Sequence, residues 1–223
     1  MALLDSQGSG VPHGRRWRRS LPKPASSRVL MDKPKRPSER QLEEMLPSTL
    51  LTADDRELRY LALTDDLTCL YNRRGFVAAA TQQLKLARRN ARGLVLFFCD
   101  IDNLKTINDS YGHREGDLAI VRAAGALQQT FRDSDILARL SGDEFAVLAL
   151  ETSTQSQEAI LRRLEKNLKK SNANQFRYEM SLSVGLSRFD PKHPVSLGEL
   201  MAQADQAMYE QKRSRLRACL TKP

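Results

Sequence analysis

The sequence of 223 residues, 40% hydrophobic and 28% charged, fits one domain of ordinary size with an appended segment. Its net charge of +9 comes mainly from residues 1–40, which hold ten Lys/Arg and three Asp/Glu, whereas the remainder holds 26 against 24. A nearly neutral folded part argues against a nucleic-acid-binding protein, and no apolar run approaches the length of a membrane span.

The cysteines and the basic leader indicate in which compartment the protein is found and what its leader can contact. Cys69, Cys99 and Cys219 are far apart and form no CxxC pair, which indicates neither a zinc site nor a disulfide framework and favours a reducing cytoplasm. Residues 1–50 form a basic, Pro/Ser-rich leader whose composition predicts disorder. A basic segment of this kind can also touch nucleic acid or anionic lipid.

Hydrophobic periodicity predicts a lead-in helix over 51–64, followed by alternating helices and strands. In the loop between 64 and 74, Asp65 is expected to pair with Arg73. Asp102 and Asp109 are interpreted as helix-start carboxylates favoured by the helix dipole. The predicted elements of the domain are a helix over 76–89, a strand over 94–100, a helical turn over 103–111, a helix over 117–131, a hairpin over 137–150, a helix over 156–170, a strand over 180–186 and a helix over 196–213.

A hairpin therefore interrupts the alternation of strands and helices. This order favours the α/β class in its mixed, α+β form, with a central, mostly antiparallel mixed sheet flanked by helices, over a purely parallel sheet.

Acidic residues stand at the ends of two predicted strands. The apolar run over 94–99 is typical of a strand buried on both faces, and Asp100 follows it directly. The hairpin over 137–150 places Asp143 and Glu144 at its tip. If strand and hairpin are neighbours, the three carboxylates converge, which predicts a divalent cation. The alternative for Asp100 and Glu144 is a salt bridge with a nearby lysine.

Four separated stretches carry conspicuous Asp, Asn, Gly and basic residues. They are TDDLTCLYNRR over 64–74, DIDNLK over 100–105 with Asn108-Asp109, Gly112-His113 and Gly116-Asp117, SGDEF over 141–145, and ADQAMY over 204–209 with Lys212. In order and spacing they resemble the motifs of the GGDEF family, the diguanylate cyclase module, with an SGDEF variant of the namesake motif. The resemblance places the domain at 65–217 and leaves 218–223 as a C-terminal tail.

The resemblance implies a palm-like fold similar to that of nucleotidyl cyclases, and a reaction. Two GTP molecules would condense into cyclic di-GMP and pyrophosphate across a homodimer, with Mg²⁺ (or Mn²⁺) as cofactor. Phosphoryl transfer needs charge neutralisation and in-line positioning, which such a site supplies.

Residue roles follow from the matching positions. By the resemblance, Asp100, Glu144 and the carbonyl of Ile101 bind the metal, and Asp143 assists deprotonation of the 3′-hydroxyl or binds a second metal. The implied substrate-binding residues are the guanine-reading Asn108 and Asp117, the phosphate-contacting Lys105 and Lys212, and the nucleotide-lining Leu104, Ser141 and Gly142.

Five residues separate the stretch Arg132-Asp133-Ser134-Asp135 from Ser141. This R-x-x-D spacing resembles the family's inhibitory site, where Arg132 and Asp135 would bind the product cyclic di-GMP. The alternative is that Asp135 is an ordinary strand-start residue paired with Arg132.

Three positions depart from the family pattern. Ser141 replaces the first Gly of the namesake motif, Cys69 replaces a common Gly, and Leu216 stands where the family has a basic residue. They motivate an alternative function, a catalytically degenerate module that acts as a receptor for cyclic di-GMP or GTP or as an interaction domain. A nucleic-acid-binding role rests on the basic leader alone.

Overall fold

The computed structural model describes residues 58, 60–150, 154–173 and 177–220. The predicted leader over 1–50 and most of the lead-in helix lie outside this range, although residues 58 and 60–63 are helical. The described elements are α3 (Arg73–Arg89), β1 (Leu94–Ile101), α4 (Leu104–Tyr111), α5 (His113–Thr130), β2 (Ile136–Ser141), β3 (Glu144–Leu150), α6 (Thr154–Asn172), β4 (Leu182–Phe189) and α7 (Leu197–Leu220).

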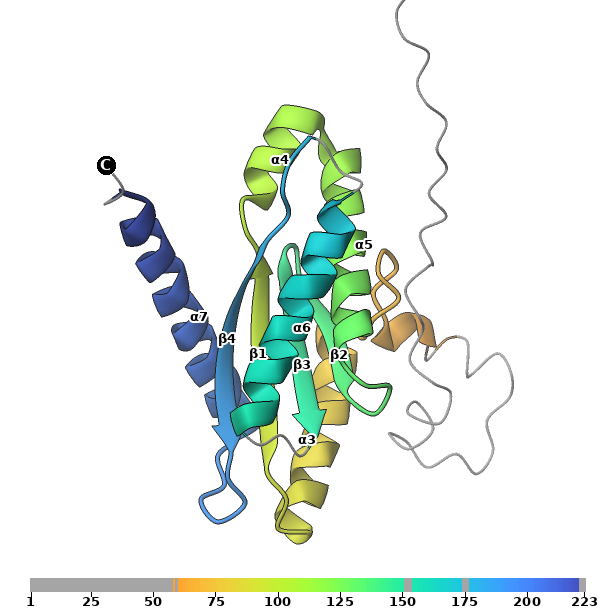
Figure 1. Ribbon diagram of the computed structural model, residues 1–223. Coiled ribbons are helices and arrows are strands. Elements are labelled where there is room, and N and C mark those ends of the chain that lie inside the picture. The colour runs from red at the N-terminus through yellow and green to blue at the C-terminus, as the bar shows by residue number, and fades with distance from the viewer. Residues whose placement is uncertain (1–57, 59, 151–153, 174–176, 221–223) are drawn as a thin grey trace, which may run out of the picture. The chain divides into compact units, whose positions relative to one another are not determined.

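The four strands form one sheet in the order β2-β3-β1-β4, in which every neighbouring pair is antiparallel (Figure 1). One isolated parallel bridge, between Tyr71 and Ala138, adds a short segment beside β2. The predicted fold class, a mostly antiparallel sheet with flanking helices, is confirmed. Strand β1 is one of the two inner strands, and because it pairs antiparallel with β3, its last residues lie at the same end of the sheet as the β2–β3 turn.

Side chains of β1 alternate between two cores, as expected for a strand buried on both faces. Val95, Phe97 and Cys99 pack with apolar residues of α5 and α6. Leu94 and Leu96 pack on the opposite face with residues of α3 and α7. The helices therefore cover both faces of the sheet and fix the position of its edges.

Helix α7 approaches the sheet closely at one glycine. A Cβ atom built on Gly185 of β4 would lie 2.0 Å from the carbonyl oxygen of Ala204. Only glycine allows this separation, and it lets α7 extend over the end of β1. No helix in the described parts of the chain is long and apolar enough to cross a membrane.

Several predicted boundaries are wrong by a few residues. Helix α3 begins at Arg73 because the Asn72 side chain caps it, accepting a hydrogen bond from the N–H of Gly75 at 2.9 Å. Helix α5 begins at His113, four residues before the predicted start, and includes Gly116. The strand predicted over 180–186 runs from Leu182 to Phe189, and the last helix continues past 213 to Leu220.

Candidate active site

The ends of β1 and β3 bring two carboxylates face to face. Asp100 of β1 is the cross-strand partner of Glu144, the first residue of β3. The N–H of Ile101 donates to the carbonyl oxygen of Asp143 at 3.1 Å, which ties the turn to the end of the central strand. The sequence-predicted juxtaposition of Asp100 and Glu144 thus follows from strand register.

Lys212, from α7, completes this group. Its Nζ donates to Oδ1 of Asp100 at 2.6 Å, and the two side chains are 31% and 13% exposed. The lysine salt bridge considered as an alternative is therefore present for Asp100. Glu144 instead accepts a hydrogen bond from the hydroxyl of Ser141.

Burial and the neighbouring Lys212 have opposite effects on the pKa of Asp100. Desolvation raises the pKa of the Asp100 carboxyl, the hydrogen bond and charge of Lys212 lower it, and the charges of Asp143 and Asp102 raise it. Burial is the largest of these effects, so the pKa is raised overall. A nearby cation therefore stabilises the charged form of this carboxylate.

The expected cluster of three carboxylates is not formed. Within the described residues, no group of three His, Cys, Asp or Glu side chains is arranged to hold a metal ion. Asp143 lies in the hairpin turn directly before Glu144, and its charge acts on Asp100. Two carboxylates and a backbone carbonyl are nevertheless hard oxygen donors that suit Mg²⁺ or Mn²⁺, with the remaining positions left for water and phosphate.

The N-terminus of α4 lies just beyond Asp100. Asn103 precedes this helix in the left-handed conformation, with φ of 59°, and makes no side-chain capping bond. Leu104 is buried and Lys105 is exposed. Uncapped N–H groups and a lysine next to two carboxylates form a place where phosphate oxygens could meet both backbone donors and a metal.

Asn108 and Asp117 lie on either side of the α4–α5 corner. A Cβ atom on Gly116 would lie 1.9 Å from Oδ1 of Asn108, so the amide rests directly against the first turn of α5. Asp117 is the next residue and is exposed. The structure thus places Asn108 against the residue that precedes Asp117, and Gly116 provides the room.

Two acidic residues are not the helix-start carboxylates predicted from sequence. The carboxylate of Asp102 accepts hydrogen bonds from the hydroxyls of Ser181 and Ser183, each at 2.6 Å, and thereby joins the end of β1 to β4. Asp109 lies in the last turn of α4. Non-local hydrogen-bond donors on β4 determine the role of Asp102, which the local pattern could not show.

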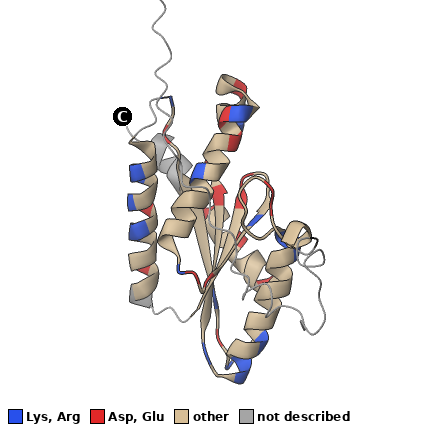
Figure 2. Cartoon of the chain, turned by 90° about the vertical axis from the view of Figure 1, so that its right-hand side faces the viewer, with Lys and Arg blue, Asp and Glu red and all other residues tan. Residues whose placement is uncertain are grey.

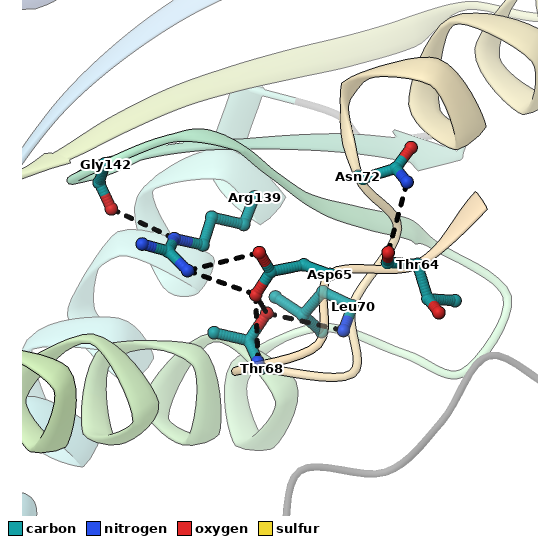
Figure 3. Close-up of polar contacts among 7 residues, drawn as sticks. All are labelled: Thr64, Asp65, Thr68, Leu70, Asn72, Arg139 and Gly142. Carbon is teal, nitrogen blue, oxygen red and sulfur yellow. Dashed lines mark hydrogen bonds and ion pairs between the residues drawn. The ribbon is translucent and has the colours of Figure 1, made fainter. Parts of the chain in front are cut away.

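The predicted Asp65–Arg73 pair is also wrong. The carboxylate of Asp65 accepts from Nη1 of Arg139 at 3.1 and 3.2 Å, and also from the N–H and hydroxyl of Thr68 (Figure 3). Nε of Arg139 in turn donates to the carbonyl oxygen of Gly142 at 3.0 Å. This guanidinium connects the loop at the start of the domain to the hairpin tip. Sequence reasoning missed Arg139, although a charged residue three positions before the turn was a signal.

The residues of the proposed inhibitory site lie at the other end of the hairpin. Arg132 is exposed, whereas Asp135 is buried and accepts from the N–H groups of Arg132 and Leu150 at 2.9 and 3.2 Å. Desolvation raises the pKa of Asp135; both hydrogen bonds and the charges of Arg132 and Arg163 lower it, by less. Asp135 is thus a strand-start residue bonded to backbone. Arg163 of α6, which sequence reasoning missed, adds a second guanidinium to this surface.

Comparison with known proteins gives a consistent result. A family model described as "Diguanylate cyclase, GGDEF domain" matches residues 62–217. The chain is 33% identical over 168 residues to the probable diguanylate cyclase DgcC of Escherichia coli K12, and 36% identical over 156 residues to the cyclic di-GMP phosphodiesterase NbdA of Pseudomonas aeruginosa. These matches cover 75% and 70% of this chain but 45% and 20% of the relatives, so the chain spans less than half of their length.

Solved structures agree with the sequence relatives. The coiled coil and GGDEF domain of DgcB from Caulobacter crescentus, in complex with c-di-GMP, match with a TM-score of 0.65 and 25% identity over 71% of this chain and 84% of that one. A GGDEF-domain structure of TpbB from P. aeruginosa matches with a TM-score of 0.61 and 32% identity over 68% and 89%. The sheet and helices described above are thus those of GGDEF domains.

Proposed function

The chain belongs to the GGDEF family of diguanylate cyclase domains, and from this membership we propose that it condenses two GTP molecules into cyclic di-GMP and pyrophosphate. The observation that carries the proposal is the pairing of Asp100 with Glu144 beside the uncapped N-terminus of α4. We assign the catalytic domain to residues 65–217 and its setting to the cytoplasm, where GTP is available.

Asp100, Glu144 and the Ile101 carbonyl would hold Mg²⁺ or Mn²⁺. When bound, the cation supplies charge neutralisation for the phosphate oxygens and the leaving pyrophosphate. Lys212 then exchanges its contact with Asp100 for a phosphate oxygen, and Lys105 with the first N–H groups of α4 holds the remaining negative charge. Asp143, at the turn, takes the proton of the attacking 3′-hydroxyl or contributes to a second cation.

Guanine recognition is assigned to Asn108 and Asp117. The amide and the carboxylate suit a base edge that offers an acceptor at O6 and donors at N1 and N2. Leu104, Ser141 and Gly142 line the nucleotide, where the exposed Gly142 leaves the hairpin tip without a side chain. Because one domain holds one GTP, the 3′-hydroxyl and the α-phosphate that react come from two domains, which requires a homodimer.

Product inhibition is assigned to the surface around Arg132, Asp135 and Arg163. Two guanidinium groups are suited to the phosphates of cyclic di-GMP. The two hydrogen bonds that Asp135 accepts from backbone hold its carboxylate at the start of β2. Glu144 lies at the tip of the hairpin that begins there, about 20 Å away at the usual rise of a strand, so ligand binding here would not occupy the catalytic site.

A second function, a receptor for cyclic di-GMP or GTP without turnover, is favoured by one observation. Lys212 already occupies the carboxylate that would bind the metal. Ser141 and Leu216, which depart from the family pattern, also motivate it. A receptor would need Arg132 and Asp135 but neither Asp143 nor Glu144.

Incubation of the purified chain with GTP and Mg²⁺, followed by chromatographic separation of nucleotides, tests the proposal. The wild type should form cyclic di-GMP and Glu144→Gln should form none, whereas Glu165→Gln, an exposed carboxylate on α6, should match the wild type. No product at protein concentrations that sustain a dimer would refute the cyclase. Calorimetric binding of cyclic di-GMP that is lost in Arg132→Ala would then establish the receptor.

A further inference from the structure

Basic residues gather at the end of the sheet opposite the catalytic carboxylates. We define the basic end surface as Lys85, Arg88, Arg89, Arg92, Arg188 and Lys192, all of which are exposed. Helix α3 and the turn to β1 supply four of them, and β4 with the turn to α7 supplies two. Figure 2 shows Lys and Arg gathered at the lower end of α3.

Strand register places the basic residues of α3 and those of β4 at the same end of the sheet. Leu94, at the start of β1, pairs with Phe189, at the end of β4, and Val95 pairs with Arg188. A Cβ atom on Gly93 would lie 3.5 Å from the carbonyl oxygen of Phe189, so the two turns touch. Asp100 lies at the other end of β1. A partner bound to the basic end surface would therefore leave the catalytic end free.

Among the described residues of this surface, positive charge outnumbers negative charge. Residues 73–93 contain six Lys/Arg and no Asp/Glu. Across the described residues, Lys85, Arg88, Arg89 and Arg188 form no ion pair. The acidic residue of the second turn, Asp190, is bonded to His193 and to the N–H of Lys192, and it offsets part of the charge of Lys192. Such a group of cations attracts an extended anionic surface.

An apolar side chain stands among these cations. Leu86 is 41% exposed and lies on the outward face of α3 with Lys85 and Arg89. Apolar side chains flanked by Lys and Arg are typical of helices that contact the lipid headgroup region. In contrast, Phe189 is buried, and the exposed ring of the second turn, His193, is bonded to Asp190, so the two turns offer little free aromatic surface on which nucleic-acid bases could stack.

We infer that the basic end surface docks this chain onto an anionic lipid bilayer, with Leu86 entering the headgroup region and the catalytic end directed away. Each Lys or Arg near such a surface adds to affinity, and the sum falls off with salt. The inference concerns a surface that the cyclase reaction does not use, so it stands or falls independently of the proposed function.

Sedimentation of the full chain with vesicles tests the inference. The vesicles are phosphatidylcholine alone or with about 30 mol% phosphatidylglycerol, because only the second kind carries the negative surface potential. We expect binding to the anionic vesicles alone. The double variant Arg88→Gln, Arg89→Gln should bind about 10-fold or more weakly, whereas Lys166→Gln, Lys170→Gln, which removes two exposed charges from α6, should bind like the wild type.

Three outcomes would overturn the inference. Equal losses in the two double variants would mean that net charge rather than this surface is responsible, and unchanged binding in both would assign the affinity to the basic leader. Binding to an oligonucleotide but not to anionic vesicles in the same buffer would assign the surface to nucleic acid. Leu86→Ala supplies a further check, since it should weaken vesicle binding without changing charge.

Discussion

Lys212 and Asp100 form an ion pair of 2.6 Å between α7 and the end of the central strand. The lysine holds the position that a divalent cation would need to approach. A cation must therefore compete with Lys212 until a phosphate group offers the lysine another partner. This relationship predicts that metal binding and nucleotide binding depend on each other.

Replacing Lys212 by Ala should reveal this competition. We expect Mn²⁺ to bind about two- to fivefold more tightly to Lys212→Ala than to the wild type without nucleotide, because a partly exposed ion pair contributes up to about 1 kcal/mol. The KM for GTP should rise. Electron paramagnetic resonance of free Mn²⁺ gives the affinity, and Arg213→Ala is the neighbouring control. Weaker Mn²⁺ binding by Lys212→Ala would contradict the competition.

Ser141→Ala tests the hydroxyl that donates to Glu144. Without this hydrogen bond the carboxylate is less restrained, and we expect the Mg²⁺ concentration for half-maximal activity to rise about two- to fivefold with a smaller change in kcat. Initial rates over a Mg²⁺ titration give both values. An equal fall in kcat at saturating Mg²⁺ would instead place Ser141 in the reaction itself.

Gly116→Ala should displace Asn108, because the new Cβ would lie 1.9 Å from its amide oxygen. We expect the KM for GTP to rise about tenfold and discrimination against ATP to fall, since a base-reading group is moved. Gly125→Ala lies in the same helix with no atom near its Cβ and should leave KM unchanged. If both variants behave alike, the assignment of Asn108 to guanine is wrong.

Cys69 adopts a positive φ of 58°, a conformation that is costly for residues with a side chain. Cys69→Gly should therefore stabilise the domain by about 0.5–1 kcal/mol, after allowing for the greater freedom of glycine in the unfolded chain. Ala78→Gly, at an exposed position within α3, should destabilise it by a similar amount. Urea denaturation of the two variants gives opposite shifts if the backbone conformation is responsible.

Burial gives Asp135 a pH dependence opposite to that of a salt-bridged aspartate. Its pKa is raised above the ordinary 3.8, so just above that value the folded protein retains a proton that the unfolded chain releases. The free energy of unfolding of the wild type relative to Asp135→Asn should therefore be greatest below pH 3.8 and fall as the pH rises through the folded-state pKa. Urea denaturation at a series of pH values gives the free energy of unfolding of both proteins, and EDTA removes divalent cations. A rise with pH would mean that the two backbone hydrogen bonds outweigh burial.

Local sequence determined much of the fold and part of the site. The apolar run of β1 and the hairpin each follow from a pattern within a few residues, and their pairing brings Asp100 to Glu144. The ion pair between Asp65 and Arg139 joins residues 74 positions apart, and a local sequence pattern cannot predict such a contact. The helix predicted over 117–131 leaves out Gly116, whereas Gly116 is a helical residue that makes room for Asn108.

The central position of β1 also sets the order in which parts of the domain open. Strand β1 is hydrogen-bonded to β3 and to β4 along its length, whereas β4 has one neighbouring strand and β2 has one neighbouring strand and the short bridge at Tyr71. Amide protons from Val95 to Cys99 should therefore exchange with solvent only when the sheet as a whole opens, and those of β2 should exchange earlier. Asp100 is carried by the slowest-exchanging segment, so fluctuations that loosen the sheet margins leave this carboxylate in place.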